Sequence, residues 1–565
     1  MSGSLRPAAL LAGVLALASL PPAARAQPLP LFPAQPRPGV GPLRAAGPAY
    51  AIAYRVAMPD PASHLYEVSV DVSAPAGRTL GDTLRLVLPV WSPGRYARVD
   101  FARNVQSFAA ATDGAPLRWA KQGGSTWLVA ARGARRVTAR YRVFANTLSG
   151  TYSVLDTAHA NWNGAGLFMY VDGHKPDPVS LAVVAPNGWT VVNGVTEGGN
   201  GGAQTRRDSA GTAHFTFPNY DELVDTPTEV APAAALTVDS VTVDGRLYRL
   251  MVHHNGPRPA GARERFVAQV RALVTRENQV VAPPPLRAYT FLFNLGYPGG
   301  DGMEHLYSTE IISARPWAAD TAAPLAGVST ASHEYFHTWN VKRLRPAALG
   351  PFDYTEAQHE PSLWVAEGWT QYYGDLTMAR TGVAARPAYY ATLGRVLGVA
   401  VGSPARKERS PRQASYDAPF FDGARAPMAT NADATFVSYY TAGAARALAL
   451  DLMIRAESRG ARSLDDVLRL LKRRAWDEAP AASYYLRGRG YTEEDVERAA
   501  SEVMGRDLRG WFDRYVGGTE DLPWAEILRP VGLTVDASGA AGAWTVAEDP
   551  RATPEQVRLR EGWLR

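Results

Sequence analysis

The spacing of hydrophobic residues changes along this chain, and that change constrains the fold more than any other feature. From residue 50 to about residue 235, apolar and polar residues alternate in short runs such as "LYEVSVDVSA" and "RRVTARYRVFA", which are separated by Gly, Pro, Asn and Asp. A period of two is typical of strands with one buried face, and the separating residues favour turns. This part of the chain is therefore predicted to be an antiparallel β-domain.

After residue 235 the pattern becomes mixed and then helical. "RERFVAQVRALVTREN" predicts a helix, "AYTFLFNLG" a buried strand and "MEHLYSTEII" a second strand-like segment. Beyond about residue 380, "YYTAGAARALALDLMIRAES", "SLDDVLRLLKRRAW" and "YTEEDVERAASEVMG" predict helices, and Ser463 and Thr492 precede aspartates by three residues, as in capping boxes. At 565 residues the chain is long enough for three or four domains, so we expect a multidomain α+β protein.

The first residues are typical of a secretory signal peptide. Arg6 precedes an apolar run from about residue 8 to residue 20, and small residues at 24 and 26 predict cleavage before Gln27. The alternative, a membrane anchor, is disfavoured because the run is short for a bilayer, and no later segment is apolar enough to span one. The chain contains no cysteine, which excludes disulfides and lipid attachment to an N-terminal cysteine. We expect an exported protein, periplasmic or secreted.

The first residues of the segment "ASHEYFHTWNVKRLRP" suggest a metal site. His333 and His337 are four residues apart, so on a helix they lie on the same face and can reach one point. Glu334 flanks that point, and zinc takes neutral histidine nitrogens while a nearby carboxylate accepts a proton from water. The alternative is an amphipathic helix that happens to carry two histidines.

A catalytic zinc site needs a third protein ligand. Position 343 is Arg, which excludes the class of zinc protease that places a third histidine there. Glu367, in the amphipathic segment "SLWVAEGWTQYYGDL", is the preferred ligand. Three nearer residues lie in a polar segment that is predicted to be a loop: Glu356, His359 and Glu360.

These two motifs resemble the glycyl aminopeptidase family, a branch of the HExxH-plus-Glu zinc metallopeptidases related to thermolysin. The resemblance extends to "LPVWSPGRYARVDFARNV" and "GRDLRGWFDRYVGGTEDLPWAEIL", and so covers about residues 47 to 530. It implies a thermolysin-like zinc catalytic domain between the β-domain and a C-terminal helical region. The segment after Pro530 is too short for the PDZ domain that members of the family commonly have, and its "VDASGAAGAWTVAEDP" is expected to form a strand pair.

Together the pattern and the resemblance predict these segments: a signal peptide at 1–26, a Pro-rich leader at 27–46, the β-domain at 47–235, the catalytic domain at 236–395, the helical domain at 396–530 and a tail at 531–565.

The resemblance also implies roles for individual residues. His333, His337 and Glu367 would bind one zinc ion per chain, and Glu334 would be the general base. "GMEH", with Gly302, Met303 and Glu304, matches an exopeptidase motif in which the glutamate binds the substrate α-ammonium and the strand edge binds its backbone. The alternative for Glu304 and His305 is a surface strand pair.

A tyrosine hydroxyl is expected to stabilise the oxyanion. Tyr440 in "VSYYTAG" matches the family segment best, although the lysine that relatives carry two residues later is Ala442 here. Tyr439 is the second choice, and core packing is the alternative for either. Asp375 could orient a ligand histidine or could be a surface acid at a helix end.

The function predicted is that of a zinc aminopeptidase that removes small N-terminal residues such as Gly or Ala. A thermolysin-like endopeptidase and an inactive peptide-binding protein are the alternatives. The expected partners are peptides with free N-termini. The basic residues are interleaved with acidic ones, and the formal net charge is only +5, so nucleic-acid binding is not expected. The oligomeric state stays open.

Overall fold

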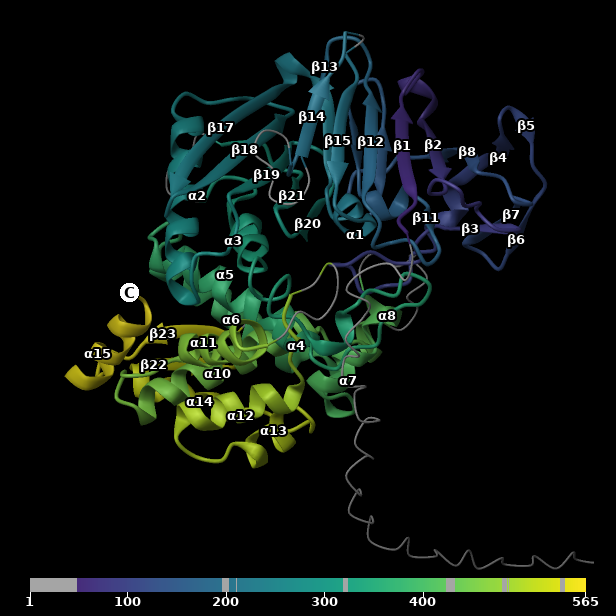
Figure 1. Ribbon diagram of the computed structural model, residues 1–565. Coiled ribbons are helices and arrows are strands. Elements are labelled where there is room, and N and C mark those ends of the chain that lie inside the picture. The colour runs from purple at the N-terminus through teal and green to yellow at the C-terminus, as the bar shows by residue number, and fades with distance from the viewer. Residues whose placement is uncertain are drawn as a thin grey trace, which may run out of the picture. The chain divides into compact units, whose positions relative to one another are not determined.

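The structure is a computed structural model that describes residues 48–195, 203–209, 211–318, 324–422, 432–479, 485, 487–538 and 544–565. The predicted signal peptide and the whole of the predicted leader therefore lie outside the described residues. The described residues, which begin at residue 48, all belong to one compact unit. Along this unit a region dominated by strands is followed by a region dominated by helices (Figure 1), which confirms the predicted α+β class.

The largest sheet has eight strands, which Figure 1 shows side by side. In spatial order they are β14 Ala203–Arg207, β15 Ala213–Phe217, β12 Val179–Val184, β1 Ala51–Ala57, β2 Leu65–Ser73, β8 Arg136–Phe144, β4 Val105–Thr112 and β5 Ala115–Pro116. Every second residue of β2 is buried, as the alternation predicted. The sheet differs from the prediction at one place: β1 and β12 are parallel, which the long connection between them allows.

Two four-stranded sheets complete the strand-rich region. One contains β11 Tyr170–Val171, β3 Thr83–Val87, β7 Thr126–Ala130 and β6 Trp119–Gln122; the other contains β13 Trp189–Asn193, β16 Thr228–Pro232, β10 Ala160–Trp162 and β9 Ser153–Leu155. The short helix α1 Tyr220–Val224 precedes β16. A single hydrophobic core joins all three sheets, with Tyr66, Trp127 and Trp162 among its large side chains.

A five-stranded sheet carries the next part of the chain. Its spatial order is β17 Leu236–Val243, β18 Arg246–His254, β19 Ala288–Leu295, β21 Ser308–Ser313 and β20 Gly300–Glu304. The central strands are parallel, and all residues of β19 are buried because both faces of the sheet are covered. On one face Phe291 and Phe293 pack with α2 Ala262–Val280 and α3 Val328–Phe336, which lie next to the sheet in Figure 1. β20 is an edge strand.

Most of the remaining helices contribute to a second large core, to which α7 and α9 add none of the described residues. They are α4 Leu363–Ala366, α5 Gly368–Arg380, α6 Arg386–Gly402, α7 Pro411–Tyr416, α8 Ala418–Phe421, α9 Ala432–Thr435, α10 Tyr439–Glu457, α11 Leu464–Lys472, α12 Glu493–Met504, α13 Arg509–Tyr515, α14 Trp524–Leu528 and α15 Pro554–Trp563. Capping boxes begin α11 at Ser463 and α12 at Thr492, as predicted.

Two glycines bring the helices closest to the site into backbone contact. A Cβ on Gly368, at the start of α5, would lie 2.3 Å from the Cα of Gly443 in α10, and a Cβ on Gly443 would lie 2.1 Å from the carbonyl oxygen of Trp364. Larger residues would force the helices apart. This crossing places the end of α4 against the first turns of α10.

The tail forms the predicted strand pair. β22 Leu533–Asp536 and β23 Thr545–Glu548 are antiparallel. The pair packs on α6, where a Cβ on Gly394 would lie 2.1 Å from the carbonyl oxygen of Trp544. The domain limits stay a prediction. Among the described residues, no helix has both the length and the apolar character needed to cross a membrane.

Candidate active site

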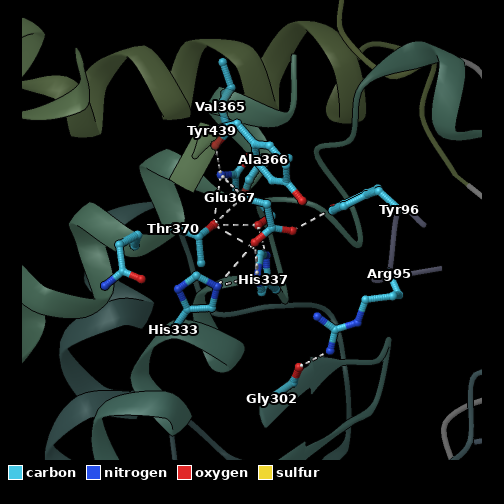
Figure 2. A network of polar contacts seen from close by, with 12 residues as sticks. Arg95, Tyr96, Gly302, His333, His337, Val365, Ala366, Glu367, Thr370 and Tyr439 are labelled. Carbon is cyan, nitrogen blue, oxygen red and sulfur yellow. Dashed lines mark hydrogen bonds and ion pairs between the residues drawn. The ribbon is translucent and has the colours of Figure 1, made fainter. Parts of the chain in front are cut away.

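His333, His337 and Glu367 converge on one point (Figure 2). The Nε2 atoms of the two histidines are 3.0 Å apart, and each lies 3.4 Å from Oε2 of Glu367. A tetrahedral zinc centre with bonds of about 2.0–2.1 Å places its ligand atoms about 3.4 Å apart. Two ring nitrogens and one carboxylate oxygen at these separations can hold a metal ion of the zinc class.

The three side chains come from α3 and from the junction between α4 and α5. His333 is on α3, His337 follows the last residue of that helix, and Glu367 stands between α4 and α5. The predicted helix around Glu367 is therefore divided at this residue. A Cβ on Gly374 of α5 would lie 3.1 Å from the backbone nitrogen of His333, so a larger side chain would crowd the approach of α5 to α3.

Hydrogen bonds fix the orientation of these groups. Tyr96 donates to Oε1 of Glu367 at 2.7 Å, and Nδ1 of His337 lies 2.6 Å from the carbonyl oxygen of Asn340. The Asn340 side chain in turn donates to the carbonyl oxygen of Val365 at 2.9 Å, which ties the end of α3 to α4. Metal-binding histidines usually have such a partner on the second nitrogen. His337 has one, and the partner is not Asp375.

Asp375 lines the same cavity, and no hydrogen bond among the described residues joins it to a histidine nitrogen. It accepts a hydrogen bond of 2.8 Å from Gln371, and burial, partly offset by that bond, raises its pKa to about 6. The proposed orienting role is therefore taken by the Asn340 carbonyl. The alternative of an acid on the open surface is also wrong, since Asp375 lines the cavity.

The cavity is acidic around His337, whereas burial lowers the pKa of His333. Burial alone would lower the pKa of His337, but the negative charges of Glu367 and Glu304 raise it to about 10. Burial raises the pKa of Glu334 well above its ordinary value, against the opposing charge of His337. A potential that stabilises an extra proton on a buried imidazole also favours a metal cation at the same place.

The "GMEH" strand forms another wall of this cavity. Glu304 and His305 are only 2% and 1% exposed, which excludes a surface strand pair. A Cβ on Gly302 would lie 2.1 Å from Oε1 of Glu334, so only glycine leaves room for that carboxyl group. The backbone carbonyl of Gly302 accepts from Arg95 at 3.4 Å (Figure 2), and Met303 is fully buried.

The cavity has a volume of about 360 Å³ and opens between the strand-rich region and the helices. Tyr440 lines it with its ring 6.1 Å from that of His333, whereas the hydroxyl of Tyr439 donates to Asp422 at 2.9 Å. The choice between the two tyrosines thus favours Tyr440. The predicted site residues that line the cavity are Gly302, Glu304, His333, Glu334, His337, Glu367 and Tyr440; Met303 lies behind it.

Sequence reasoning missed the residues that the N-terminal region contributes. Tyr96 contacts Glu367, and Arg95 forms an ion pair of 2.6 Å with Asp301, next to Gly302. A Cβ on Gly94 would lie 2.7 Å from Oε2 of Glu304, so this loop lies directly on the glutamate. The segment "SPGRYARVDF" was noted as a mark of the family, but nothing in its local pattern indicates that it reaches the site.

Comparisons with known proteins found two family models that match parts of this chain. A model of the peptidase M61 N-terminal domain matches residues 53–232, and a model of the M61 glycyl aminopeptidase matches residues 326–445. No curated protein matches the chain significantly.

Among solved structures, an aminopeptidase N family protein from Idiomarina loihiensis is similar with a TM-score of 0.73 and 26% identity over 86% of this chain and 79% of that one. An M1 zinc metallopeptidase from Deinococcus radiodurans has a TM-score of 0.49 and 15% identity over 86% and 99%, a likeness too low to carry an argument. The two family models together match more than half of the chain, and they lie on the strand-rich region and on the helices that carry the site. The chain therefore belongs to the M61 glycyl aminopeptidase family and is a peptidase.

Proposed function

We propose that this peptidase is a zinc-dependent aminopeptidase that removes small residues from peptides with free N-termini. His333, His337 and Glu367 would hold the zinc ion, since their donor atoms have the chemistry and the spacing that zinc requires. Zinc in such a site supplies a Lewis acid that polarises the scissile carbonyl group and lowers the pKa of water. The acidic surroundings of His337 support a cation at this place.

Glu334 is proposed as the group that moves protons. It lies beside the ligands in the cavity, and one of its carboxylate oxygens is within 4.8 Å of ligand atoms of Glu304 and His337. Burial raises its pKa, which brings the carboxyl group nearer to the range in which it can both accept a proton and return it. Glu334 would accept the proton of the attacking water and deliver it to the leaving amine.

The proposal that this peptidase is an exopeptidase depends mainly on Glu304. Its carboxylate is buried in the cavity wall, and Oε1 has no hydrogen-bond partner among the residues that the structure describes. An unpaired buried carboxylate is costly, and an α-ammonium group that enters the cavity would pair with it. β20 is an edge strand, so its backbone is placed to bind an extended peptide. An endopeptidase has no use for such an ammonium site.

A small apolar recess beside Glu304 supports a preference for small N-terminal residues. It borders Gly94 and Glu304, as the main cavity does, and has a volume of about 30 Å³. That is room for about two water-sized groups, which suits the side chain of alanine better than that of leucine. Its apolar lining comes from Trp91, Pro93, Val341, Leu349 and Phe352.

Tyr440 is proposed to donate a hydrogen bond to the oxyanion that forms during attack on the carbonyl group. Its ring is stacked beside His333 at the edge of the cavity. Because a hydroxyl donor aimed at developing charge stabilises the transition state more than the substrate, its loss should lower turnover more than affinity. The signal sequence supports export to the periplasm or beyond, where peptides would be the substrates.

One assay tests the proposed function directly. Hydrolysis of Ala and Gly anilides should be compared with that of the same compounds carrying an N-acetyl group. The proposal expects zinc-dependent release from the free amines and little from the blocked compounds. Internal cleavage of acetylated peptides at an equal rate would favour the endopeptidase alternative instead.

A further inference from the structure

A second cluster of metal-binding residue types lies outside the candidate active site. His159 precedes β10, Glu229 lies on β16 and His253 on β18, and one ligand atom from each falls within 4.8 Å of the others. All three side chains are almost completely buried. The cluster joins the sheet of β9, β10, β13 and β16 to the five-stranded sheet.

Both histidines of this cluster lie close to the Glu229 carboxylate, but only one of the two contacts has the geometry of a hydrogen bond. The Nδ1 atoms of His159 and His253 each lie 3.0 Å from Oε1 of Glu229. The His159 contact has hydrogen-bond geometry, whereas Nδ1 of His253 is buried and has no hydrogen-bond partner in the part of the chain that the structure covers. The His253 nitrogen is therefore close to the carboxylate without pointing at it as a donor. Such an arrangement fits two ligands that face a common ion.

The second nitrogen of His253 has a suitable partner. Nε2 lies 2.8 Å from the hydroxyl of Tyr297. When Nε2–H donates to the tyrosine oxygen, Nδ1 carries the lone pair that a metal requires. This is the arrangement in which metal-binding histidines are usually held. Tyr297 would thus orient His253 for metal binding.

A second buried carboxylate lies on the same face of the five-stranded sheet as His253. Leu292 on the middle strand β19 pairs with Met251 on β18 and with Glu310 on β21, so these three side chains share one face of the sheet. His253 and Asn294 are a second pair, two residues further along β18 and β19, and therefore lie on the same face as Glu310. Asn294 donates to Oε2 of Glu229 at 3.4 Å, which places that face against β16. Glu310 is fully buried, and burial and the charge of Glu229 raise the pKa of its carboxyl group well above its ordinary value, against a hydrogen bond from Asn161. Such a group needs a cation or a proton.

We propose that His159, Glu229 and His253 bind a structural divalent transition-metal ion. Two imidazole nitrogens and a carboxylate oxygen are donors that zinc accepts, and the almost complete burial of all three side chains is typical of a non-catalytic site. The ion would neutralise the charge of Glu229 and link the two sheets, and it would enter as the chain folds.

A metal-free network is the competing account. Oε2 of Glu229 also accepts from Asn161 at 3.0 Å, and a proton on Glu310 would remove the second charge. The two accounts differ in the number of metal ions that the folded protein retains. That number can be measured independently of catalysis.

The test uses a variant in which the active-site histidines are removed and the cluster is untouched. The His333→Ala, His337→Ala protein, purified from zinc-supplemented cells and dialysed against metal-free buffer, should retain about one equivalent of zinc by elemental analysis. Adding His253→Gln should remove that metal, whereas adding His174→Gln, as a matched control in the same region, should not. X-ray absorption by the retained zinc should show imidazole ligands.

The outcomes separate this proposal from the proposed function. A double variant that retains no zinc overturns the second site even if the cluster variants do not fold, because the cluster is intact in that protein. Zinc that survives the addition of His253→Gln in a folded protein overturns it as well. If instead the double variant keeps as much zinc as the wild type, and the wild type holds only one equivalent, the active-site assignment fails and the second site stands.

Discussion

Tyr96 and Glu367 are joined by a hydrogen bond of 2.7 Å, although they are 271 positions apart in the chain. The strand-rich region thus contributes directly to a group that we propose as a metal ligand. Because the donor is a buried phenol and the acceptor a buried carboxylate, the bond is worth more than it would be in water. The N-terminal region is therefore part of the site and not only a covering for it.

Tyr96→Phe should weaken metal binding without preventing folding. The substitution removes only the hydroxyl, and loss of a partner to a ligand typically costs about 10-fold to 100-fold in metal affinity. Competition with a chelator measures this effect. Tyr389→Phe is the matched control, since Tyr389 is equally buried and its hydroxyl has no hydrogen-bond partner in the described ranges. Equal affinities of the two variants would show that the Tyr96 bond is irrelevant to the metal.

Glu334→Gln should separate metal binding from chemistry. The amide keeps the shape of the side chain but cannot accept a proton, so turnover should fall by at least about 10²-fold. Zinc content should be unchanged, because Glu334 is not among the three converging ligands. Steady-state kinetics and elemental analysis on the same preparation check both statements. Near-normal turnover would remove Glu334 from the proposed mechanism.

Glu304→Gln should impair recognition of free N-termini. A charge-assisted hydrogen bond to the α-ammonium group contributes about 1.5–3 kcal/mol, so kcat/KM for free substrates should fall about 10-fold to 100-fold. N-acetylated peptides should be poor substrates for both proteins and should respond little to the change. An equal loss for free and blocked substrates would indicate a general structural role for Glu304.

Gly302→Ala should displace the proposed base. The new Cβ would lie 2.1 Å from Oε1 of Glu334 and 2.8 Å from Cγ2 of Thr330, so the carboxyl group must move. Since small misplacements of catalytic groups are costly, kcat should fall by at least about 10-fold. Gly300→Ala on the same strand is the control, because a Cβ there meets nothing within 4 Å. The prediction fails if both variants keep the kcat of the wild type.

Removal of the metal should make stability depend on pH in a defined direction. Without zinc, burial opposes the charge on His337, but Glu367 and Glu304 raise its pKa from 6.5 to about 10. Because the folded state then binds the proton more tightly than the unfolded state, this contribution is fully present below about pH 6.5. It is lost as the pH rises through about 10.

Thermal unfolding of the metal-free protein between pH 6 and pH 10 should therefore show a falling midpoint. The zinc-bound protein should lack this particular slope, because a histidine that binds zinc is neutral. Identical slopes for the two forms would mean that His337 does not experience the acidic potential described above. Re-addition of zinc should restore both activity and the flatter profile.

Local sequence patterns predicted the parts of the site that depend on local structure. His333 and His337 are four residues apart on one helix, so their side chains were expected to meet, and the segment around Glu367 was recognised by its amphipathic character. The division of that segment into α4 and α5 was not predicted, since residues on both sides of Glu367 continue the helical hydrogen bonds. The fold class followed from the change in hydrophobic spacing.

Contacts between distant segments could not be predicted in this way. Tyr96 reaches Glu367, and His159 reaches Glu229 and His253, only because particular strands pair and particular sheets pack. Strand spacing indicates which residues share a face but not which strand faces another. The resemblance to a family supplied the roles of Glu304 and Tyr440, which periodicity alone would not have given.

The backbone contact between Gly368 and Gly443 limits how this site can change during evolution. Glu367 directly precedes one glycine, and Tyr440 stands three residues before the other, so the spacing of the two side chains is set by main-chain atoms. Neither glycine can be replaced alone without separating the helices, and a compensating change in a neighbouring side chain cannot restore the contact. Sequences that drift around this crossing must therefore keep both glycines, while the walls of the recess beside Glu304 remain free to alter substrate preference.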